Sequence, residues 1–286
     1  MSTYEDYADV SSYYDNGRQA AGVEMFSTTI QGYLKKPMQE IHLLDAGCGT
    51  GNYSKGFLDN GIGKVSALDA SQGMLSKAKD KLTPYSKDSR VGDIIQGQLP
   101  QIAFNDACFD AVTFIQVLQH LDKPYEGFTD TKSSILEAFR VLKPGGVLLI
   151  NTSTHDQLRY GEWYRNLLPH SVENQCDRFI PVTELLAFLK EQGFEKAAVI
   201  VCPWESILTD EQYFNMDGPF DESWRRINSV WKIAENGGEL ATALKTLKEK
   251  KDFGIFDDWF EQVEEKRKNL GLTTTIFVQK PQSGKQ

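Results

Sequence analysis

The stretch "LLDAGCGTG", from Leu43 to Gly51, places one acidic residue, Asp45, at the end of an apolar run and follows it with alternating glycines. The apolar residues predict a buried β-strand, and the residues after the last glycine predict a helix. Glycine tolerates the backbone of a tight turn and lacks the Cβ that would hold a ligand away from the main chain. The stretch therefore predicts a strand–turn–helix unit in which the turn, with Gly47 and Gly49, lies against a ligand.

Short apolar runs and helical stretches alternate on both sides of this turn. The strict alternation predicts right-handed βαβ crossovers, and therefore an α/β fold with a doubly wound, mostly parallel sheet that is covered on both faces. The strands are expected at 41–46, 64–70, 92–96, 109–118, 145–153, 196–203 and 273–281. The helices are expected at 18–34, 51–60, 71–82, 134–142 and 182–194.

Two stretches, 156–178 and 203–270, interrupt the alternation and are expected to form helical caps over the substrate. The remaining parts are an N-terminal lid and helix, 1–40, and one core domain made of 41–202 and 271–281. The aromatic residues of the caps either line an aromatic substrate pocket or build a small core for the caps themselves. These residues are Trp163, Tyr164, Trp204, Phe214, Phe220, Trp224 and Trp231.

The composition of the chain excludes several classes of partner. The 286 residues carry a formal net charge of -9, which favours neither nucleic acid nor an anionic membrane. The four cysteines are scattered without metal-ligand spacing, so we expect reduced thiols and no bound metal. No apolar run approaches the roughly 18–20 residues that span a bilayer. We therefore expect a cytoplasmic protein, either a monomer or a homodimer.

The second expected strand also ends in an acid, Asp69. A carboxylate at that position can accept hydrogen bonds from both hydroxyls of a ribose. The earlier acid, Asp45, would repel a pyrophosphate, so a positively charged ligand group suits it better. The GxGxG spacing also differs from the GxGxxG of dinucleotide-binding folds. The pattern therefore indicates a nucleoside that carries a cation.

Three blocks of sequence, in order, carry a family resemblance. They are 43–75, then "GQLPQIAFNDACFDAV" (97–112), then "LEAFRVLKPGG" (136–146). Together they resemble class I S-adenosylmethionine-dependent methyltransferases, in particular the small-molecule group related to ubiquinone and menaquinone biosynthesis. The resemblance implies a seven-stranded Rossmann-like sheet, S-adenosylmethionine as cofactor and S-adenosylhomocysteine as product. It also implies a small metabolite as methyl acceptor.

The resemblance assigns a role to each residue at the strand ends. Asp45 faces the aminoacyl end of the cofactor, the alternative being that it only caps the helix that follows. Gln98 aligns with an acid that in the family contacts the adenine amino group, and it can still accept that hydrogen bond. Gln116 either contacts the methionyl part or is a polar strand-end residue. The implied cofactor residues are Tyr14, Arg18, Asp45, Gly47, Gly49, Asp69, Ala70, Met74, Gln98, Leu99 and Gln116.

Methyl transfer from a sulfonium mainly requires alignment and exclusion of water, and a base only if the acceptor must lose a proton. His155 and His120 follow the fifth and fourth expected strands, so both should face the cleft, with His155 the first choice as base or substrate contact. The alternative for His120 is a structural role, hydrogen-bonded under the cofactor loop. Tyr13 is the third candidate, because tyrosine rings attract a sulfonium through cation–π contacts. The other explanation for the tyrosines near the N-terminus is that they anchor that segment against the sheet.

Two other functions stay open at this point. A nicotinamide-dependent dehydrogenase is disfavoured by the glycine spacing and by Asp45. A non-catalytic binding module on a methyltransferase scaffold is disfavoured because the motif block is intact. Methylation of nucleic acid or glutamine amino groups is disfavoured because "IQVLQHL" follows the fourth strand, where such enzymes carry an N/D-PP-Y/F motif.

Overall fold

The computed structural model describes residues 15, 17–125, 127–203 and 206–282, and its centre is one seven-stranded sheet. The strand order is β3-β2-β1-β4-β5-β7-β6, with β1 to β5 parallel and β7 antiparallel to both of its neighbours. The strands are β1 (His42–Ala46), β2 (Lys64–Asp69), β3 (Val91–Gln96), β4 (Phe109–Ile115), β5 (Leu142–Thr152), β6 (Glu195–Val201) and β7 (Thr274–Gln279). The prediction of a doubly wound, mostly parallel sheet is confirmed.

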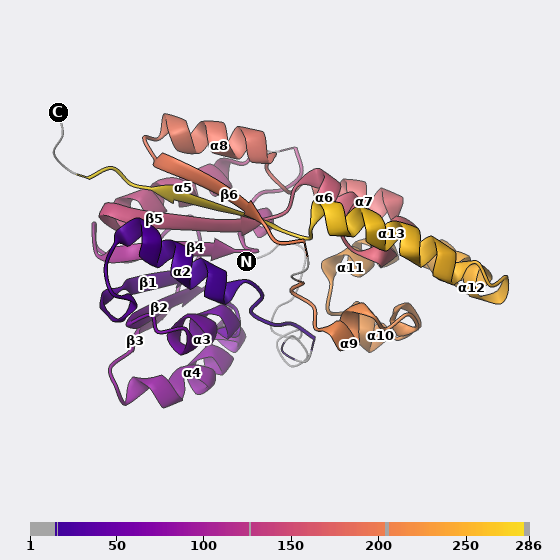
Figure 1. Ribbon diagram of the computed structural model, residues 1–286, viewed down its shortest axis with the longest axis horizontal. Coiled ribbons are helices and arrows are strands. Elements are labelled where there is room, and N and C mark those ends of the chain that lie inside the picture. The colour runs from indigo at the N-terminus through magenta and orange to yellow at the C-terminus, as the bar shows by residue number, and fades with distance from the viewer. Residues whose placement is uncertain (1–14, 16, 126, 204–205, 283–286) are drawn as a thin grey trace.

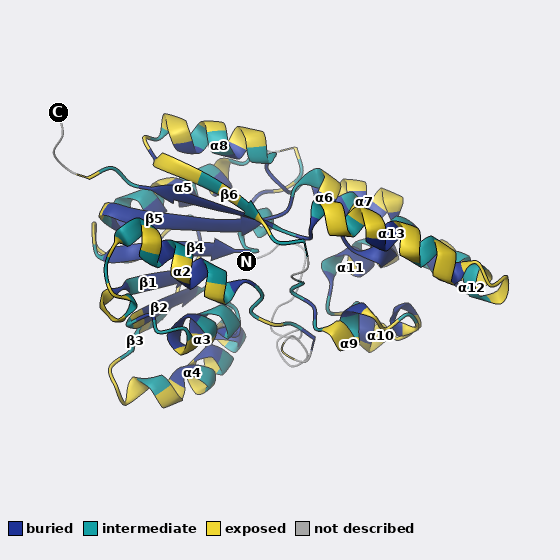
Figure 2. Ribbon diagram, in the orientation of Figure 1, coloured by how far each residue is buried: buried dark blue, intermediate teal, exposed yellow. Residues whose placement is uncertain are grey.

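Helices cover both faces of the sheet (Figure 1). One layer contains α2 (Val23–Leu34), α3 (Asn52–Asp59) and α4 (Gln72–Ser86), and the other contains α5 (Thr129–Val141) and α8 (Val182–Glu191). Neighbouring residues of β1 serve the two layers, because successive side chains of a strand point to opposite faces. Leu43 packs with Phe26 and Phe57, whereas Leu44 packs with Ile135 and the other layer. The central strands are therefore buried on both sides, whereas the edge strand β6 is largely exposed, as Figure 2 shows.

The first helix begins later than predicted. Residues 18–22 were expected to be helical, but Gly22 has a φ of 76° and α2 starts at Val23. Arg18 instead forms an antiparallel bridge with Leu208, and the Gln19 N–H donates to the Ile207 carbonyl at 2.9 Å. Pairing with a distant segment thus overrides the local helical pattern, and it ties the N-terminal part of the chain to the second insertion.

Other boundaries also differ from the predictions, and the largest difference is at α5, which begins at Thr129 instead of at 134. The fourth strand ends at Ile115, because the next residue, Gln116, has a φ of 53° that a strand does not permit. A short 3-10 helix, η3 (Leu118–His120), follows. The helix α4 continues through Pro84, since proline has a helical φ and removes only one backbone hydrogen bond so close to the helix end.

The two insertions form a helical cap beside the sheet, on the right in Figure 1. The cap has its own apolar core, in which Trp163, Trp231 and Phe256 are buried together. Of the other aromatic residues, Tyr164 and Trp224 are buried, Phe214 and Phe220 are exposed, and Trp204 lies outside the described residues. The structure therefore favours a core of the cap over an aromatic pocket.

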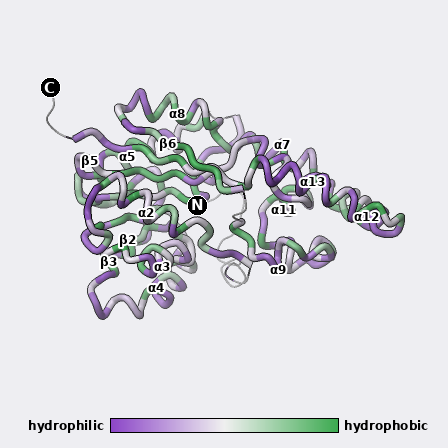
Figure 3. The backbone as a smooth tube through the Cα atoms, viewed as in Figure 1, coloured by the Kyte–Doolittle hydropathy of each residue, from purple (hydrophilic) through white to green (hydrophobic). Residues whose placement is uncertain are grey.

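Short helices make up most of this cap. In chain order they are α6 (His155–Tyr160), η4 (Trp163–Leu167), α7 (Pro169–Cys176), α9 (Asp210–Tyr213), η5 (Gly218–Phe220), α10 (Glu222–Arg225), α11 (Ser229–Asn236), α12 (Leu240–Asp252) and α13 (Phe256–Leu270). Figure 3 shows polar and apolar residues mixed along them, while the strands of the sheet are the most apolar stretches. Among the described residues, no helix is both long and apolar enough to cross a membrane.

Candidate functional site

The glycine turn after β1 is bound to the end of β2. The N–H groups of Gly47 and Cys48 both donate to the Leu68 carbonyl, at 2.7 and 3.0 Å. Gly47 and Gly49 have φ of 83° and 54°, which disfavour any residue with a side chain. A Cβ on Gly47 would lie 2.5 Å from Val117, whereas a Cβ on Gly49 would have no atom within 4 Å. Gly47 is therefore required for packing, while Gly49 faces open space.

Asp69 lies beside this open space, at the end of β2. Its Oδ2 accepts a hydrogen bond from the Gly49 N–H and its Oδ1 one from the Ser71 N–H, both at 2.8 Å. Burial raises the pKa of the carboxyl, while the hydrogen bonds from Ser71 and Gly49 lower it. Each carboxylate oxygen has capacity for a further hydrogen bond. The carboxylate is thus fixed in place and can accept two hydroxyl groups of a ligand.

Asp45 is almost fully buried under the same turn. Its Oδ2 accepts from the Ser54 hydroxyl at 2.6 Å and its Oδ1 from the Thr113 hydroxyl at 3.1 Å. Burial raises its pKa to about 6, and the charge of Asp69 adds to this, against the hydrogen bonds from Ser54 and Thr113. Ser54 lies in the first turn of α3, so these contacts match the helix-capping alternative. Any action of Asp45 on a ligand therefore comes from its charge.

The N-terminal segment is also anchored to the glycine turn. Asp15 accepts a hydrogen bond from the Thr50 hydroxyl at 2.6 Å and forms an ion pair of 2.9 Å with Lys81 of α4. These hydrogen bonds, and the charge of Lys81, hold the pKa of Asp15 below its ordinary value against the effect of burial. Together with the Arg18–Leu208 bridge, they place the start of the described chain between the turn and the cap.

A pocket of about 70 Å³ lies between the edge of the sheet and the cap. From the β4 side, the residues that line it are Gln116, Gln119 and His120. These three flank Val117, the residue that packs against Gly47, so the pocket adjoins the glycine turn. The cap contributes Gln157, Glu162, Arg165, Gln175, Asn228 and Ser229. The apolar lining residues are Leu158, Phe179, Ile207 and Leu272.

The two candidate histidines differ in their surroundings. His120 lines the pocket, and burial lowers its pKa to about 4, with smaller contributions from the charges of Arg18 and Arg178. His155 does not line the pocket, and its Nε2 lies 2.9 Å from the Phe179 carbonyl oxygen, to which it donates. The expectation that both histidines face the cleft is therefore wrong for His155, which links α6 to the segment after α7.

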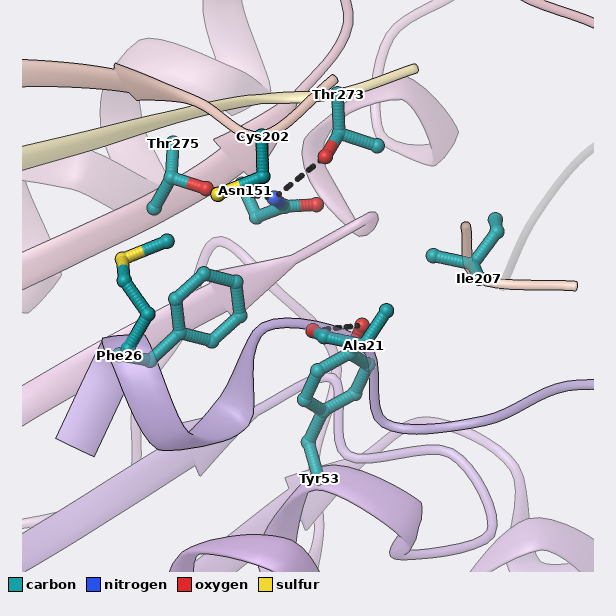
Figure 4. Close-up of a pocket in the computed structure, with 9 residues that line it drawn as sticks. Ala21, Phe26, Tyr53, Asn151, Cys202, Ile207, Thr273 and Thr275 are labelled. Carbon is teal, nitrogen blue, oxygen red and sulfur yellow. Dashed lines mark hydrogen bonds between the residues drawn. The ribbon is translucent and has the colours of Figure 1, made fainter. Parts of the chain in front are cut away.

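Polar side chains meet at the ends of β5 and β7, beside Gln116. The Asn151 amide donates to Thr275 at 2.8 Å and to Thr273 at 3.3 Å, and its oxygen accepts from Gln116 at 2.9 Å. Figure 4 shows Asn151 and these threonines above Phe26 and Tyr53, around a small hollow that Cys202 also borders. This network holds Gln116 in its left-handed conformation at the edge of the pocket.

A comparison with known families assigns the part of the chain that carries the glycine turn. Residues 44–150 match the family described as a methyltransferase domain. This part of the chain is a class I S-adenosylmethionine-dependent methyltransferase domain. The predicted resemblance is thus confirmed, and the match contains the second half of β1 with Asp45, β2 with Asp69, and the strands β3 and β4.

Curated relatives of the methyltransferase domain modify different substrates. A malonyl-[acyl-carrier protein] O-methyltransferase from Serratia marcescens is 31% identical over 50% of this chain and 49% of its own length. A ubiquinone biosynthesis O-methyltransferase from Azoarcus sp. is 28% identical over 54% of this chain and 64% of its own length. The chain thus spans less than two thirds of either relative, and neither match identifies its acceptor.

Solved structures show that the fold extends over most of the chain. One is a protein from an antibiotic biosynthesis pathway of Anabaena variabilis, which is 18% identical to this chain. The two superpose with a TM-score of 0.67 over 89% of this chain and 96% of the other. Phosphoethanolamine N-methyltransferase 2 of Haemonchus contortus, in complex with S-adenosylmethionine, is 19% identical with a TM-score of 0.52 and covers 90% of this chain and 53% of its own. At these identities the likeness establishes the fold alone.

The residues of the methyltransferase domain fit S-adenosylmethionine at the glycine turn. The open space at Gly49 adjoins the carboxylate of Asp69, which can accept hydrogen bonds from ribose hydroxyls. Other predicted residues lie around it. Met74 and Leu99 are buried, Gln98 is exposed, and the Ala70 carbonyl accepts from Gln96 at 3.0 Å. Tyr13 and Tyr14 lie outside the described residues, and Arg18 lines the cap pocket.

The polar residues of the cap that line the pocket are not among the site residues predicted from the sequence. The cap residues Glu162 and Arg165 form a buried ion pair, and Arg165 also donates to Gln175. The sequence does contain one indication of them. Glu162 and Arg165 are opposite charges three residues apart, in a largely apolar stretch with Trp163, Tyr164 and Leu167. Charged residues rarely occur in such a stretch unless they are paired. Among the described residues, no three His, Cys, Asp or Glu side chains could hold a metal ion.

The two turn glycines should respond differently to alanine. Gly49→Ala costs about 1–2 kcal/mol of backbone strain, but its Cβ enters the ligand space, so affinity for S-adenosylhomocysteine should fall about tenfold or more. Gly47→Ala adds a clash with Val117 and should lower stability further. Urea unfolding without ligand and titration calorimetry separate the two effects. Normal affinity in Gly49→Ala would show that the ligand does not approach this turn.

The pH dependence of cofactor binding should report on Asp45. In the folded protein its pKa of about 6 exceeds the ordinary aspartate value of 3.8. Without ligand, the folded protein therefore binds this proton more tightly than the unfolded chain does, and it loses stability as pH rises from about 4 to 6. An ammonium group nearby favours the ionised form, so affinity for S-adenosylhomocysteine should rise up to about pH 6 and then level off. Calorimetry from pH 5 to 7.5 measures this, with Asp45→Asn as the pH-independent control. A flat wild-type profile would contradict the role.

Proposed function

We propose that the protein transfers a methyl group from S-adenosylmethionine to a small-molecule metabolite by in-line displacement. The observation that carries this proposal is the juxtaposition of Asp69 with the open space at Gly49, inside a methyltransferase domain. The named relatives act on small molecules or on an acyl-carrier-bound group, which supports the substrate class. We also propose that the protein is a cytoplasmic monomer or homodimer without a nucleic-acid or membrane partner. The net charge of -9 supports the last point, because it does not favour binding to nucleic acid or to an anionic membrane.

The residues that would hold the cofactor lie at the ends of β1, β2 and β4. Asp69 accepts the ribose hydroxyls, the turn at Gly47 and Gly49 admits the aminoacyl part, and Asp45 supplies negative charge beneath it. Gln98 reaches the adenine edge from its exposed position after β3. When bound, S-adenosylmethionine supplies a methyl group on a positively charged sulfur, which needs no further activation.

The residues that would act on the acceptor line the pocket under the cap. Gln116, held by Asn151, presents its amide at the junction between the glycine turn and the pocket. His120 replaces His155 as the proposed proton acceptor, because it lines the pocket and its low pKa keeps the ring neutral at physiological pH. The cap and the segment at Arg18 exclude water from this space.

The variant His120→Gln tests this assignment. If the acceptor must lose a proton, kcat should fall about 100-fold while affinity for S-adenosylhomocysteine stays the same. Because the pKa of His120 is about 4, the wild-type rate should not decline between pH 8 and pH 6 through loss of this base. The exposed His170 provides the control variant His170→Gln. An unchanged kcat in His120→Gln would remove the histidine from the reaction.

The proposed function itself is tested by a screen with methyl-labelled S-adenosylmethionine and a panel of metabolites. The expected result is transfer of label to a small molecule with formation of one S-adenosylhomocysteine per product. Two results would contradict it: purified protein that retains a nicotinamide dinucleotide, or protein that binds S-adenosylhomocysteine but transfers no label to any member of the panel.

A further inference from the structure

The pocket under the cap is polar, although the aromatic core of the cap is apolar. Only Leu158, Phe179, Ile207 and Leu272 are apolar among the described lining residues. The described tryptophans of the cap pack in its aromatic core and do not line the pocket. Most of these polar groups already bond one another, so an apolar acceptor would leave only their remaining donors, such as Nη2 of Arg165, unpaired, which costs about 1–3 kcal/mol for each group.

Arg165 is held at this pocket by a buried network. Its Nε forms an ion pair with Glu162, and its Nη1 donates to the Gln175 oxygen. Asn228 donates to Glu162 at 3.2 Å and to the Tyr164 hydroxyl at 2.8 Å, so the carboxylate is fixed as well. The second terminal nitrogen, Nη2, has no hydrogen-bond partner among the described residues. One edge of the guanidinium thus has donors for a ligand.

Among the described residues that line the pocket, positive charges outnumber negative ones, although the whole chain carries -9. Arg18 and Arg165 line the pocket, and Arg178 is close enough to His120 to lower the pKa of its ring. Glu162 is the only carboxylate among the described lining residues, and it is already paired with Arg165. A buried ion pair rarely stabilises a fold more than apolar residues would, so this network is better explained by ligand binding than by stability.

We propose, on the basis of the proposed methyltransferase function, that the acceptor is a small carboxylic acid whose carboxylate is bound by Arg165. A planar carboxylate matches the guanidinium edge and gains charge-assisted hydrogen bonds. Glu162 beside the same guanidinium disfavours a dianion such as a phosphate. The end to be methylated would lie toward Gln116 and His120, where the pocket adjoins the glycine turn.

The test compares acids with their amides. Thermal unfolding of the protein with S-adenosylhomocysteine bound is followed at constant ionic strength with glycolate, lactate and benzoate, and with glycolamide, lactamide and benzamide. At least one acid should bind about tenfold more tightly than its amide. The preference should vanish in the double variant Glu162→Gln/Arg165→Gln, which removes both charges and so leaves none unpaired. The preference should persist in the control variant Arg159→Gln, because Arg159 lies on the cap surface, where it is paired with Glu173.

The outcomes separate this inference from the proposed function. Arg18→Gln provides a second variant if the double variant does not fold, and it should weaken the preference for acids. Equal binding of acid and amide by the wild type, an acid preference that the double variant retains or that Arg18→Gln leaves undiminished, or tighter binding of inorganic phosphate would overturn the acid-binding role. Failure to bind S-adenosylhomocysteine, measured separately by calorimetry, would instead overturn the methyltransferase assignment.

Discussion

Asp69→Ala is expected to lower the affinity for S-adenosylhomocysteine at least about 100-fold. The side chain is fixed by the Gly49 and Ser71 N–H groups and, in the proposal, accepts two ribose hydroxyls. Hydrogen bonds to a charged group contribute about 1.5–3 kcal/mol each, so losing two removes about 3–6 kcal/mol of binding free energy. That range corresponds to a loss of about two to four orders of magnitude in Kd.

Titration calorimetry measures this loss, and thermal unfolding checks that the variant remains folded. Asp69→Asn is a second variant, since its amide can accept one hydroxyl and should bind with intermediate affinity. Asp93→Ala is the matched control, because Asp93 is an exposed carboxylate on the adjacent strand β3. Wild-type affinity in Asp69→Ala would exclude the ribose assignment.

Trp163→Ala is expected to lower the free energy of unfolding by about 3–5 kcal/mol. The indole is fully buried, its ring contacts those of Tyr164, Phe256 and Trp259, and its N–H donates to the Tyr213 carbonyl at 2.8 Å. The substitution leaves a large cavity at the centre of the cap and removes one buried hydrogen bond. The cap should therefore unfold at lower urea concentration.

Urea unfolding followed by tryptophan fluorescence and by circular dichroism measures the effect. Phe214→Ala is the control, because this ring is 51% exposed and contacts Tyr213 and Phe260 only at the edge of the same core. Its effect should stay near 0.5 kcal/mol. Unchanged stability of Trp163→Ala, together with loss of acceptor binding, would mean that the aromatic residues form a substrate pocket after all.

The fold and the cofactor edge could be predicted because both depend on local patterns. Apolar runs that end in Asp45 and Asp69 identify parallel strands, and parallel strands bring their carboxyl ends to one edge of the sheet. Glycines at the first strand end then indicate where a ligand reaches the main chain. The predicted start of the first helix was wrong because Arg18 pairs with Leu208, a contact that no local pattern encodes.

The pocket could not be predicted from local patterns, because its residues come from segments far apart in the chain. Arg18, His120, Arg165 and Asn228 meet only when the two insertions fold over the sheet. His155 is an example, because its position just after the fifth strand predicts that its ring faces the cleft. Its ring bonds the carbonyl of Phe179, a residue 24 positions further along the chain, and is not among the side chains that line the pocket.

The most direct test of the central claim is calorimetric titration of the purified wild-type protein with S-adenosylhomocysteine and, separately, with NADH. The account predicts one S-adenosylhomocysteine bound per chain and no heat of binding with NADH. Binding of NADH, or no uptake of S-adenosylhomocysteine, would contradict the assignment of the glycine turn and Asp69 to an adenosyl compound that carries a positive charge.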